Sequence, residues 1–240
     1  MQLQIFESLI NFIFPQRCLS CRTITQDYGL CSSCWLKINF ITKPCCAICG
    51  FPFAFETNSE ALCGNCLKLP PIFDYAYSAV KYDDNISKLI HQFKFNDQIH
   101  LAKIFAKWMV NVMSDVIYDI DYLVPVPLYK YRLLARKYNQ SALLTLEISK
   151  ITKIPSLQRA ITKVIKTESQ TELSKIARLE NVKNCYKIPS AATQIILSKN
   201  ILLVDDVFTT GATVNECAKL LKSHGARKVY IATIAKTIFS

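Results

Sequence analysis

The sequence predicts an α/β protein, in which a domain built on a parallel sheet follows a small cysteine-rich module. A length of 240 residues suits one α/β domain plus a small module, and a hydrophobic fraction of 51% is enough for a real core. Nine of the eleven cysteines lie before residue 67, which places the module at the front of the chain. The apolar run at residues 201–204 is typical of a buried strand in a parallel sheet.

The chain divides into three parts near its proline-containing segments. Residues 1–15 place five apolar residues on one helical face and end at Pro15, so they predict a docking helix. This segment is too short to span a membrane and lacks a basic leader or a cleavage-site pattern, which indicates a cytoplasmic protein with reduced thiols. Residues 16–69 hold the cysteine-rich module, and Leu69-Pro70-Pro71 predict a linker to a second domain at residues 72–240.

Eight cysteines of the module form four Cys-x2-Cys pairs, and Cys45 is a spare. Two-residue spacing lets two thiolates face one ion, so the four pairs predict two tetrahedral four-cysteine sites for structural Zn²⁺. The predicted ligands are Cys18, Cys21, Cys31, Cys34, Cys46, Cys49, Cys63 and Cys66. We expect the first pair to combine with the second and the third with the fourth; interleaved pairing, iron–sulfur ligation and plain buried thiols are the alternatives.

The strand at residues 201–204 leads into the motif with the clearest chemistry. Asp205 and Asp206 stand where this strand is expected to end, and a loop of small and hydroxyl residues around Gly211 follows. N–H groups of such a loop can bind a phosphate dianion, while the carboxylates can accept hydrogen bonds from ribose hydroxyls or hold Mg²⁺. No arrangement of the five glycines gives GxxxxGK(S/T) or GxGxxG, so this loop is the candidate phosphate site. The alternative is that the two carboxylates only cap a turn.

The remaining periodicities predict strands and helices around this motif. We expect strands at residues 75–82, 122–126, 185–188 and 228–235, and helices at 85–93, 101–117 and 213–221. A further helix is expected to begin after the basic and aromatic run that starts at Tyr129, with Asn139 or Ser141 as its N-cap. His91 and His100 are expected to be ordinary surface or turn residues.

Positive charge is concentrated in the middle of the chain. Residues 130–187 hold thirteen Lys or Arg against four Asp or Glu, whereas residues 1–70 hold five against four. Such a concentration indicates a polyanionic ligand, either pyrophosphate groups or nucleic acid. At residues 129–141 basic and aromatic side chains alternate, and the alternative to a ligand site there is a solvated basic loop or helix face. The near-neutral charge of the cysteine-rich module favours docking over nucleic-acid contact.

Residues 201–213 resemble the phosphoribosyl pyrophosphate (PRPP) signature of type I phosphoribosyltransferases. The resemblance implies a type I phosphoribosyltransferase-like fold, with Asp205 and Asp206 against the ribose hydroxyls and Thr209, Thr210, Gly211, Ala212 and Thr213 around the 5′-phosphate. It also implies a pyrophosphate side at Leu128, Arg132, Arg136, Lys137, Asn139 and Gln140, and a mobile flap at residues 167–182. Thr209 stands where hypoxanthine-type members carry a carboxylate base, which disfavours purine salvage.

Nearly the whole chain resembles the ComF/GntX family, a double zinc ribbon joined to a phosphoribosyltransferase-like domain. The match is carried by the four cysteine pairs, the Val-Pro-Val-Pro-Leu turn at residues 124–128, the block at Arg136–Gln140, the Lys-Thr-x-x-Gln run at Lys166–Gln170 and the acidic motif. Lys137 replaces a glycine that is usual in the family. The resemblance implies a role in natural transformation and in handling incoming single-stranded DNA.

Three functions are compatible with these features. The first is a phosphoribosyltransferase that uses PRPP with Mg²⁺ and an acceptor that the sequence does not identify. The second is a single-stranded DNA-binding protein of DNA uptake or recombination, in which Tyr129, Tyr131 and Tyr138 stack on bases while neighbouring cations follow phosphates. The third is a protein that senses PRPP without catalysis. The intact acidic pair favours retained PRPP binding, because a groove for DNA gains nothing from two carboxylates beside phosphates.

Overall fold

A computed structural model describes residues 15–26, 28–95, 98–165 and 184–238. The predicted flap at residues 167–182 and residues 1–14 of the predicted docking helix lie outside this part of the chain.

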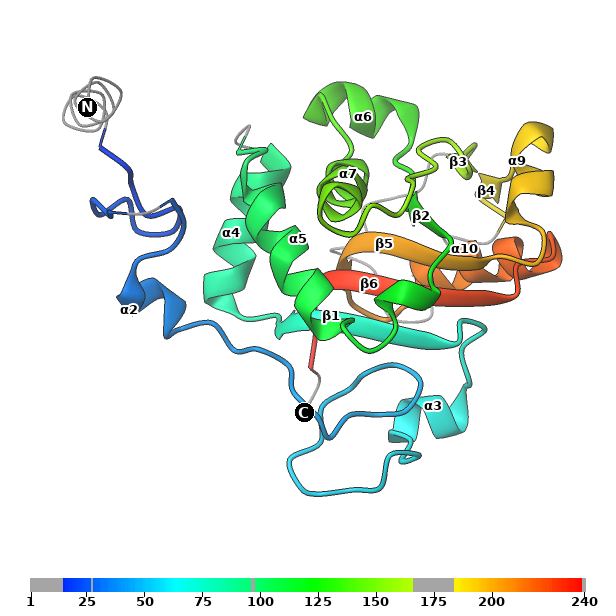
Figure 1. Cartoon of the computed structure of the whole chain (residues 1–240), viewed down its shortest axis with the longest axis horizontal. Coiled ribbons are helices and arrows are strands. Elements are labelled where there is room, and N and C mark those ends of the chain that lie inside the picture. Colours follow the sequence, from blue (N-terminus) through cyan, green and yellow to red (C-terminus); the bar gives the residue numbers. More distant parts are fainter. Residues whose placement is uncertain (1–14, 27, 96–97, 166–183, 239–240) are drawn as a thin grey trace.

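A four-stranded parallel sheet forms the centre of the molecule, as the sequence predicts (Figure 1). Its order is β1 (Tyr75–Lys81), β6 (Lys228–Lys236), β5 (Asn200–Phe208) and β2 (Tyr122–Pro125). Successive residues of β5 alternate between two cores, because neighbouring side chains of a strand point to opposite faces of the sheet. Leu202 and Val204 join one core, and Ile201 and Leu203 join the other.

Helices cover both faces of the sheet. On one face lie α4 (Asp84–Phe95), α5 (Leu101–Val112) and α7 (Gln140–Thr152), above the strands in Figure 1. On the other face lies α10 (Ala212–Ser223), which buries Val214, Cys217 and Leu221. The parallel strands all point their carboxyl ends to one edge, so the segments that follow β2 and β5 meet there.

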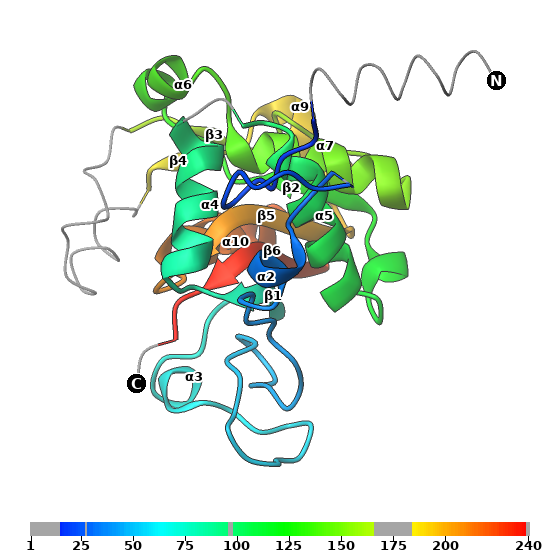
Figure 2. The same cartoon turned by 90° about the vertical axis from the view of Figure 1, so that its left-hand side faces the viewer.

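The two halves of the cysteine-rich module pack on opposite faces of the sheet. The first half, with α2 (Ser32–Trp35), packs Trp35 and Phe40 against Trp108 of α5, with ring centroids 5.9 and 5.4 Å from that ring. The second half, with α3 (Gly64–Lys68), contributes its cysteines to the core on the α10 side. Figure 2 shows the chain passing from α2 along the sheet toward α3.

The segment between the two halves covers the exposed edge of β1. The Ile41 N–H donates to the Ala79 carbonyl at 2.9 Å, and the Lys81 N–H donates to the Asn39 carbonyl at 2.8 Å. Phe40 and Val80 form an antiparallel bridge between these contacts. Because a bare edge strand exposes unpaired backbone groups, this connector (residues 39–41) completes the sheet.

Several boundaries differ from the sequence expectation. Strand β5 does not end before the acidic pair but continues to Phe208, because its ladder with β6 extends to the Phe208–Lys236 pair. The helix expected at residues 101–117 ends at Val112, and a 3₁₀ turn η1 (Ile117–Asp119) follows. The basic segment after β2 forms a short helix, α6 (Lys130–Arg136). The hairpin β3 (Thr162–Lys163) and β4 (Tyr186–Lys187) and the helix α9 (Ser190–Ile196) complete the described elements.

Candidate functional site

The turn from β5 into α10 has the geometry of an anion-binding loop. Gly211 adopts a φ of +76°, and a Cβ at this position would lie 2.7 Å from Cζ of Phe208. Glycine is therefore the residue that lets the loop turn tightly over the Phe208 ring. Directly afterwards the helix begins, with the Asn215 N–H donating to the Gly211 carbonyl at 2.9 Å. The Ala212 N–H donates to Oγ1 of Thr210 at 3.4 Å, and N–H groups at the start of a helix favour an anion such as phosphate.

The two carboxylates occupy different environments at the end of β5. Oδ1 of Asp205 accepts hydrogen bonds from Oγ of Ser141 at 3.1 Å and from the Asp206 N–H at 2.9 Å. Oδ2 of Asp206 lies 2.8 Å from Nζ of Lys94, and both side chains are mostly buried. Burial, followed by the charge of Asp206, raises the pKa of Asp205 to about 7. Asp205 is thus protonated in about half of the molecules at neutral pH.

Raising the pH through neutrality should ionise Asp205. We expect a ¹³C NMR titration of its carboxyl carbon to give a midpoint near the raised pKa of about 7, and Asp206→Asn should lower that midpoint by removing the neighbouring charge. Because the folded pKa lies above the ordinary 3.8, the folded state binds this proton more tightly, and stability from this group falls as pH rises from about 4 to about 7. A midpoint near 4 would contradict the burial argument.

Besides Lys94, three cations interact electrostatically with the acidic pair or with one another. Arg136 is attracted to Asp206 and then to Asp205, and burial lowers the pKa of its guanidinium. Arg132 lies close enough to repel both Arg136 and Lys163, and Lys163 is in turn attracted to Asp205. The sequence predicts Arg132 and Arg136 on the pyrophosphate side but misses Lys94 and Lys163, which come from α4 and β3. No local motif marks either lysine, because each reaches the site through the fold.

The other predicted residues of the basic side are positioned by hydrogen bonds. Asn139 is the N-cap of α7, since its Oδ1 accepts from the Ser141 N–H, and its Nδ2 donates to the Val126 carbonyl at 3.0 Å. Gln140 accepts from the Arg136 guanidinium at 3.3 Å and donates to the Lys94 carbonyl at 3.2 Å. These contacts link the turn after β2, the end of α4 and the start of α7.

Three further residues of the predicted anion side have simpler roles. Leu128 is half-buried in the turn between β2 and α6. Lys137 ends α6 with a φ of +65°, a conformation that glycine adopts freely and that explains why glycine suits this position. The hydroxyl of Tyr138 donates to the Phe93 carbonyl at 2.6 Å, which ties that ring to α4. Of the predicted stacking residues, Tyr131 is the most open, at 58% exposure.

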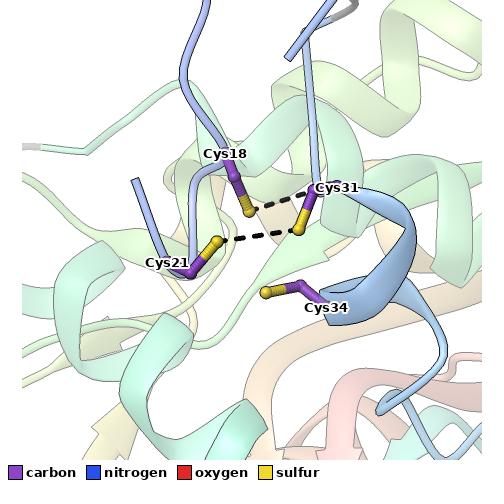
Figure 3. Close-up of side chains that lie close together, drawn as sticks. All are labelled: Cys18, Cys21, Cys31 and Cys34. Carbon is purple, nitrogen blue, oxygen red and sulfur yellow. Dashed lines mark hydrogen bonds between the residues drawn. The ribbon is translucent and has the colours of Figure 1, made fainter. Parts of the chain in front are cut away.

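The eight predicted cysteine ligands assemble as two clusters in the expected sequential pairing. The clusters are Cys18, Cys21, Cys31 and Cys34, drawn in Figure 3, and Cys46, Cys49, Cys63 and Cys66. Within each cluster all Sγ atoms lie within 4.8 Å of one another. The 3.6 Å separation of Cys21 and Cys31, repeated at Cys49 and Cys63, is close to the ~3.8 Å that tetrahedral zinc with ~2.3 Å bonds requires. The clusters therefore fit two structural zinc sites, and interleaved pairing is wrong.

The two clusters share a local backbone but differ in burial. Arg22 and Gly50 each follow the second cysteine of a pair with φ near +66° (+67° and +65°), and each N–H donates to the carbonyl of the first cysteine at 3.0 Å. The first cluster is partly exposed, whereas all four thiols of the second are buried. The second cluster therefore belongs to the core that supports the sheet.

A small cavity lies between the second cluster and the loop that follows β5. Its volume is about 120 Å³, and its walls include Cys66, Pro71, Phe208 and Thr210. Lys236 also lines it, with an almost fully buried ammonium 3.4 Å from the centre of the Phe208 ring. Burial lowers the pKa of Lys236, while the thiolates of the second cluster attract its charge. The loop thus packs on one side of the Phe208 ring at Gly211, and the ammonium of Lys236 contacts the same ring. Lys236 in turn interacts with the cysteines of the second cluster.

Two remaining expectations concern the surface. His91 and His100 are exposed, as predicted. None of the described helices combines the length and the apolar character needed to cross a membrane.

Comparison with known proteins covers nearly the whole chain. Residues 9–67 match the double zinc ribbon domain, and residues 143–238 match the phosphoribosyl transferase domain. "Competence protein F" of Haemophilus influenzae is 33% identical over 236 residues, which are 95% of this chain and 100% of that protein. "DNA utilization protein YhgH" of Escherichia coli K12 is 30% identical over 93% of this chain and 98% of its own. "Competence protein ComFC" of Bacillus subtilis is 28% identical over 84% of this chain and 81% of its own.

Proposed function

Because this chain belongs to the ComF family, in which a double zinc ribbon precedes a phosphoribosyltransferase domain, we propose that it binds PRPP with Mg²⁺ between β5 and α10. The observation that carries the proposal is the juxtaposition of an acidic pair with a helix N-terminus and several cations. A sugar diphosphate needs both kinds of partner, since its hydroxyls donate to carboxylates and its phosphates accept from N–H groups and cations.

Each part of the ligand has a proposed place. The loop residues Thr209, Thr210, Gly211, Ala212 and Thr213 hold the 5′-phosphate, and Asp205 and Asp206 accept from the ribose hydroxyls. Arg132, Arg136 and Lys137 neutralise the pyrophosphate, while Leu128, Asn139 and Gln140 shape the turn that presents them. Mg²⁺, bound with PRPP, supplies further positive charge against the pyrophosphate.

Such a site suits transfer of the phosphoribosyl group from PRPP to an acceptor. The bond from the anomeric carbon to pyrophosphate breaks, the electron pair leaves with the pyrophosphate, and an acceptor nucleophile takes its place at carbon. Cations fixed beside the leaving group stabilise the charge that develops on it. The proposal assigns no chemical identity to the acceptor. A purine is disfavoured, because Thr209 stands where a carboxylate base would be needed. Binding of PRPP without transfer is the alternative.

The names of the relatives support a role in DNA uptake or utilisation. A direct contact with single-stranded DNA is the second candidate, and α6 favours it. This helix buries none of its residues, exposes Tyr131, and places Nζ of Lys130 5.4 Å from the centre of that ring. Aromatic rings beside cations bind bases and phosphates without sequence preference. Such binding weakens steeply with salt, so a complex insensitive to salt would exclude it.

Calorimetric titration with PRPP and Mg²⁺ tests the main proposal. The wild type should bind, and the double variant Asp205→Asn/Asp206→Asn should bind at least about a hundredfold more weakly, because each charge-assisted hydrogen bond contributes about 1.5–3 kcal/mol. Asp119→Asn is the matched control, since this exposed carboxylate lies before β2, at the opposite edge of the sheet. A folded, zinc-loaded wild type that does not bind PRPP, or a double variant that binds it equally well, would overturn the proposal.

A further inference from the structure

Lys94 lies in the last turn of α4 and points its ammonium at the acidic pair. Nζ lies 2.8 Å from Oδ2 of Asp206, and the two side chains are only 21% and 15% exposed. The helix cannot easily withdraw this residue, because Ile86, Leu89, Ile90 and Phe93 bury its other face in the core. An ion pair this sheltered is screened much less by salt than one at the open surface.

The basic segment holds the same helix end from the other side. The hydroxyl of Tyr138 donates to the Phe93 carbonyl at 2.6 Å, and Nε2 of Gln140 donates to the Lys94 carbonyl at 3.2 Å. The Arg136 guanidinium lies 4.9 Å from the centre of the Phe95 ring. The position of Lys94 is therefore fixed relative to the cations that we assign to the pyrophosphate.

This placement creates a conflict over Asp206. A divalent cation bound at Asp206 would face the positive charge of Lys94 at close range, and two cations repel one another strongly where water is excluded. An anion that arrives with the metal removes the conflict. Lys94 can then donate to the anion while Asp206 faces the metal.

We propose that Lys94 is a specificity residue of the PRPP site, which excludes a bare divalent metal from Asp206 and admits the metal only with a polyphosphate. The inference rests on the proposed function of that site. In the ligand-free protein Lys94 neutralises Asp206. In the complex the same ammonium donates to the pyrophosphate, so ligand and metal are bound as one unit.

The inference predicts changes of opposite sign in one variant. Lys94→Met should bind Mn²⁺, a probe for Mg²⁺, about tenfold or more tightly, because the repelling charge is gone. The same variant should bind PRPP with Mg²⁺ about tenfold or more weakly, because a charge-assisted donor is lost. Lys94→Arg should keep both wild-type affinities within a few-fold, since it keeps the charge. A general loosening of the fold would weaken both ligands and could not produce this pattern.

The two titrations need a protein whose cysteine sites are already filled with zinc. Free Mn²⁺ is then counted by electron paramagnetic resonance, and PRPP binding is measured by calorimetry. Lys88→Met is the matched control, because Lys88 lies on the same helix, is exposed, and changes the net charge by the same amount.

The outcomes separate this inference from the proposed function. Tighter Mn²⁺ binding together with weaker PRPP binding in Lys94→Met, and neither change in Lys88→Met, would support it. A Lys94→Met protein that matches the wild type, or whose two affinities move in the same direction, would overturn it while the PRPP site stands. A wild type without PRPP binding would overturn the proposed function, and unchanged Mn²⁺ affinity in Lys94→Met would then overturn the exclusion of metal as well.

Discussion

Replacing Cys66 by serine should destabilise the whole protein, whereas replacing Cys21 should disturb only the first half of the cysteine-rich module. Cys66 is 4% exposed and packs in the core that includes Ile201 and Leu203 of β5, while Cys21 is exposed. Structural zinc contributes about 10–16 kcal/mol to the folding of small zinc modules, so the loss of one ligand forfeits several kcal/mol. We expect Cys66→Ser to lower the free energy of unfolding by several kcal/mol.

Lys236 should enlarge the difference between the two variants. Its buried ammonium is attracted to the thiolates of the second cluster, and loss of the metal site would leave this charge without compensation. An uncompensated buried charge costs several kcal/mol. Chemical denaturation followed by circular dichroism, with zinc content measured on each protein, checks the prediction. Equal destabilisation by Cys21→Ser, or a Cys66→Ser protein that keeps two zinc ions and its stability, would contradict it.

Replacing Gly50 by alanine should cost about 3 kcal/mol or more of stability. A Cβ at Gly50 would lie 2.3 Å from the Ala76 carbonyl oxygen, and that backbone belongs to β1. Neighbouring backbone holds the two segments together, since the Ala76 N–H donates to the Ile48 carbonyl at 2.8 Å. The second half of the module must therefore move away from the sheet to make room for the methyl group.

Gly64→Ala is the matched control for Gly50→Ala. Gly64 begins α3, and a Cβ there meets nothing within 4 Å. Its effect should stay within about 0.5 kcal/mol of zero, as is usual for exposed positions. Thermal melting of both variants in the presence of zinc gives the comparison. Similar melting temperatures for the two proteins would mean that the close approach of Gly50 to β1 is relaxed in solution.

Arg22 shows why the contact, rather than the backbone angle, sets the expected cost. It occupies the position of Gly50 in the first half of the module, with almost the same positive φ. The first half accepts a side chain there because Arg22 is exposed rather than pressed against a strand. A left-handed residue alone costs about 1 kcal/mol, and the larger figure for Gly50 comes from the carbonyl of Ala76.

The sequence predicts those features that depend on neighbours along the chain. Cysteine spacing predicts both clusters, and an apolar run predicts β5. For the N-cap of α7 the sequence leaves two candidates, Asn139 and Ser141, because either side chain can accept a hydrogen bond from a helix N–H. The structure decides for Asn139 through its second bond to the Val126 carbonyl, a contact that sequence spacing does not contain.

Features that depend on distant segments are not predicted. The sequence predicts that the strand ends before Asp205, because a charged residue normally ends an apolar run. In the fold Asp205 pairs with Thr233 of β6, so the strand continues past it. The pattern predicts Lys94 on the polar face of an amphipathic helix, and only the tertiary fold brings its ammonium within 2.8 Å of Asp206. The connector at residues 39–41 has too little periodicity to predict a strand, and β1 supplies the partner that extends it.

That connector limits how this protein could have been assembled in evolution. Ala76, Ala79 and Val80 of β1 are fully buried, and residues ahead of the linker supply partners to the backbone of this strand. An ancestral sheet without the cysteine-rich segment would have exposed β1 as an apolar edge strand, and such a strand can pair with the edge of another copy of the chain. Exchange of either part between genes would therefore require a matching change in the other. The cysteine-rich module and the sheet therefore depend on each other for their packing, although their sequences predict separate modules.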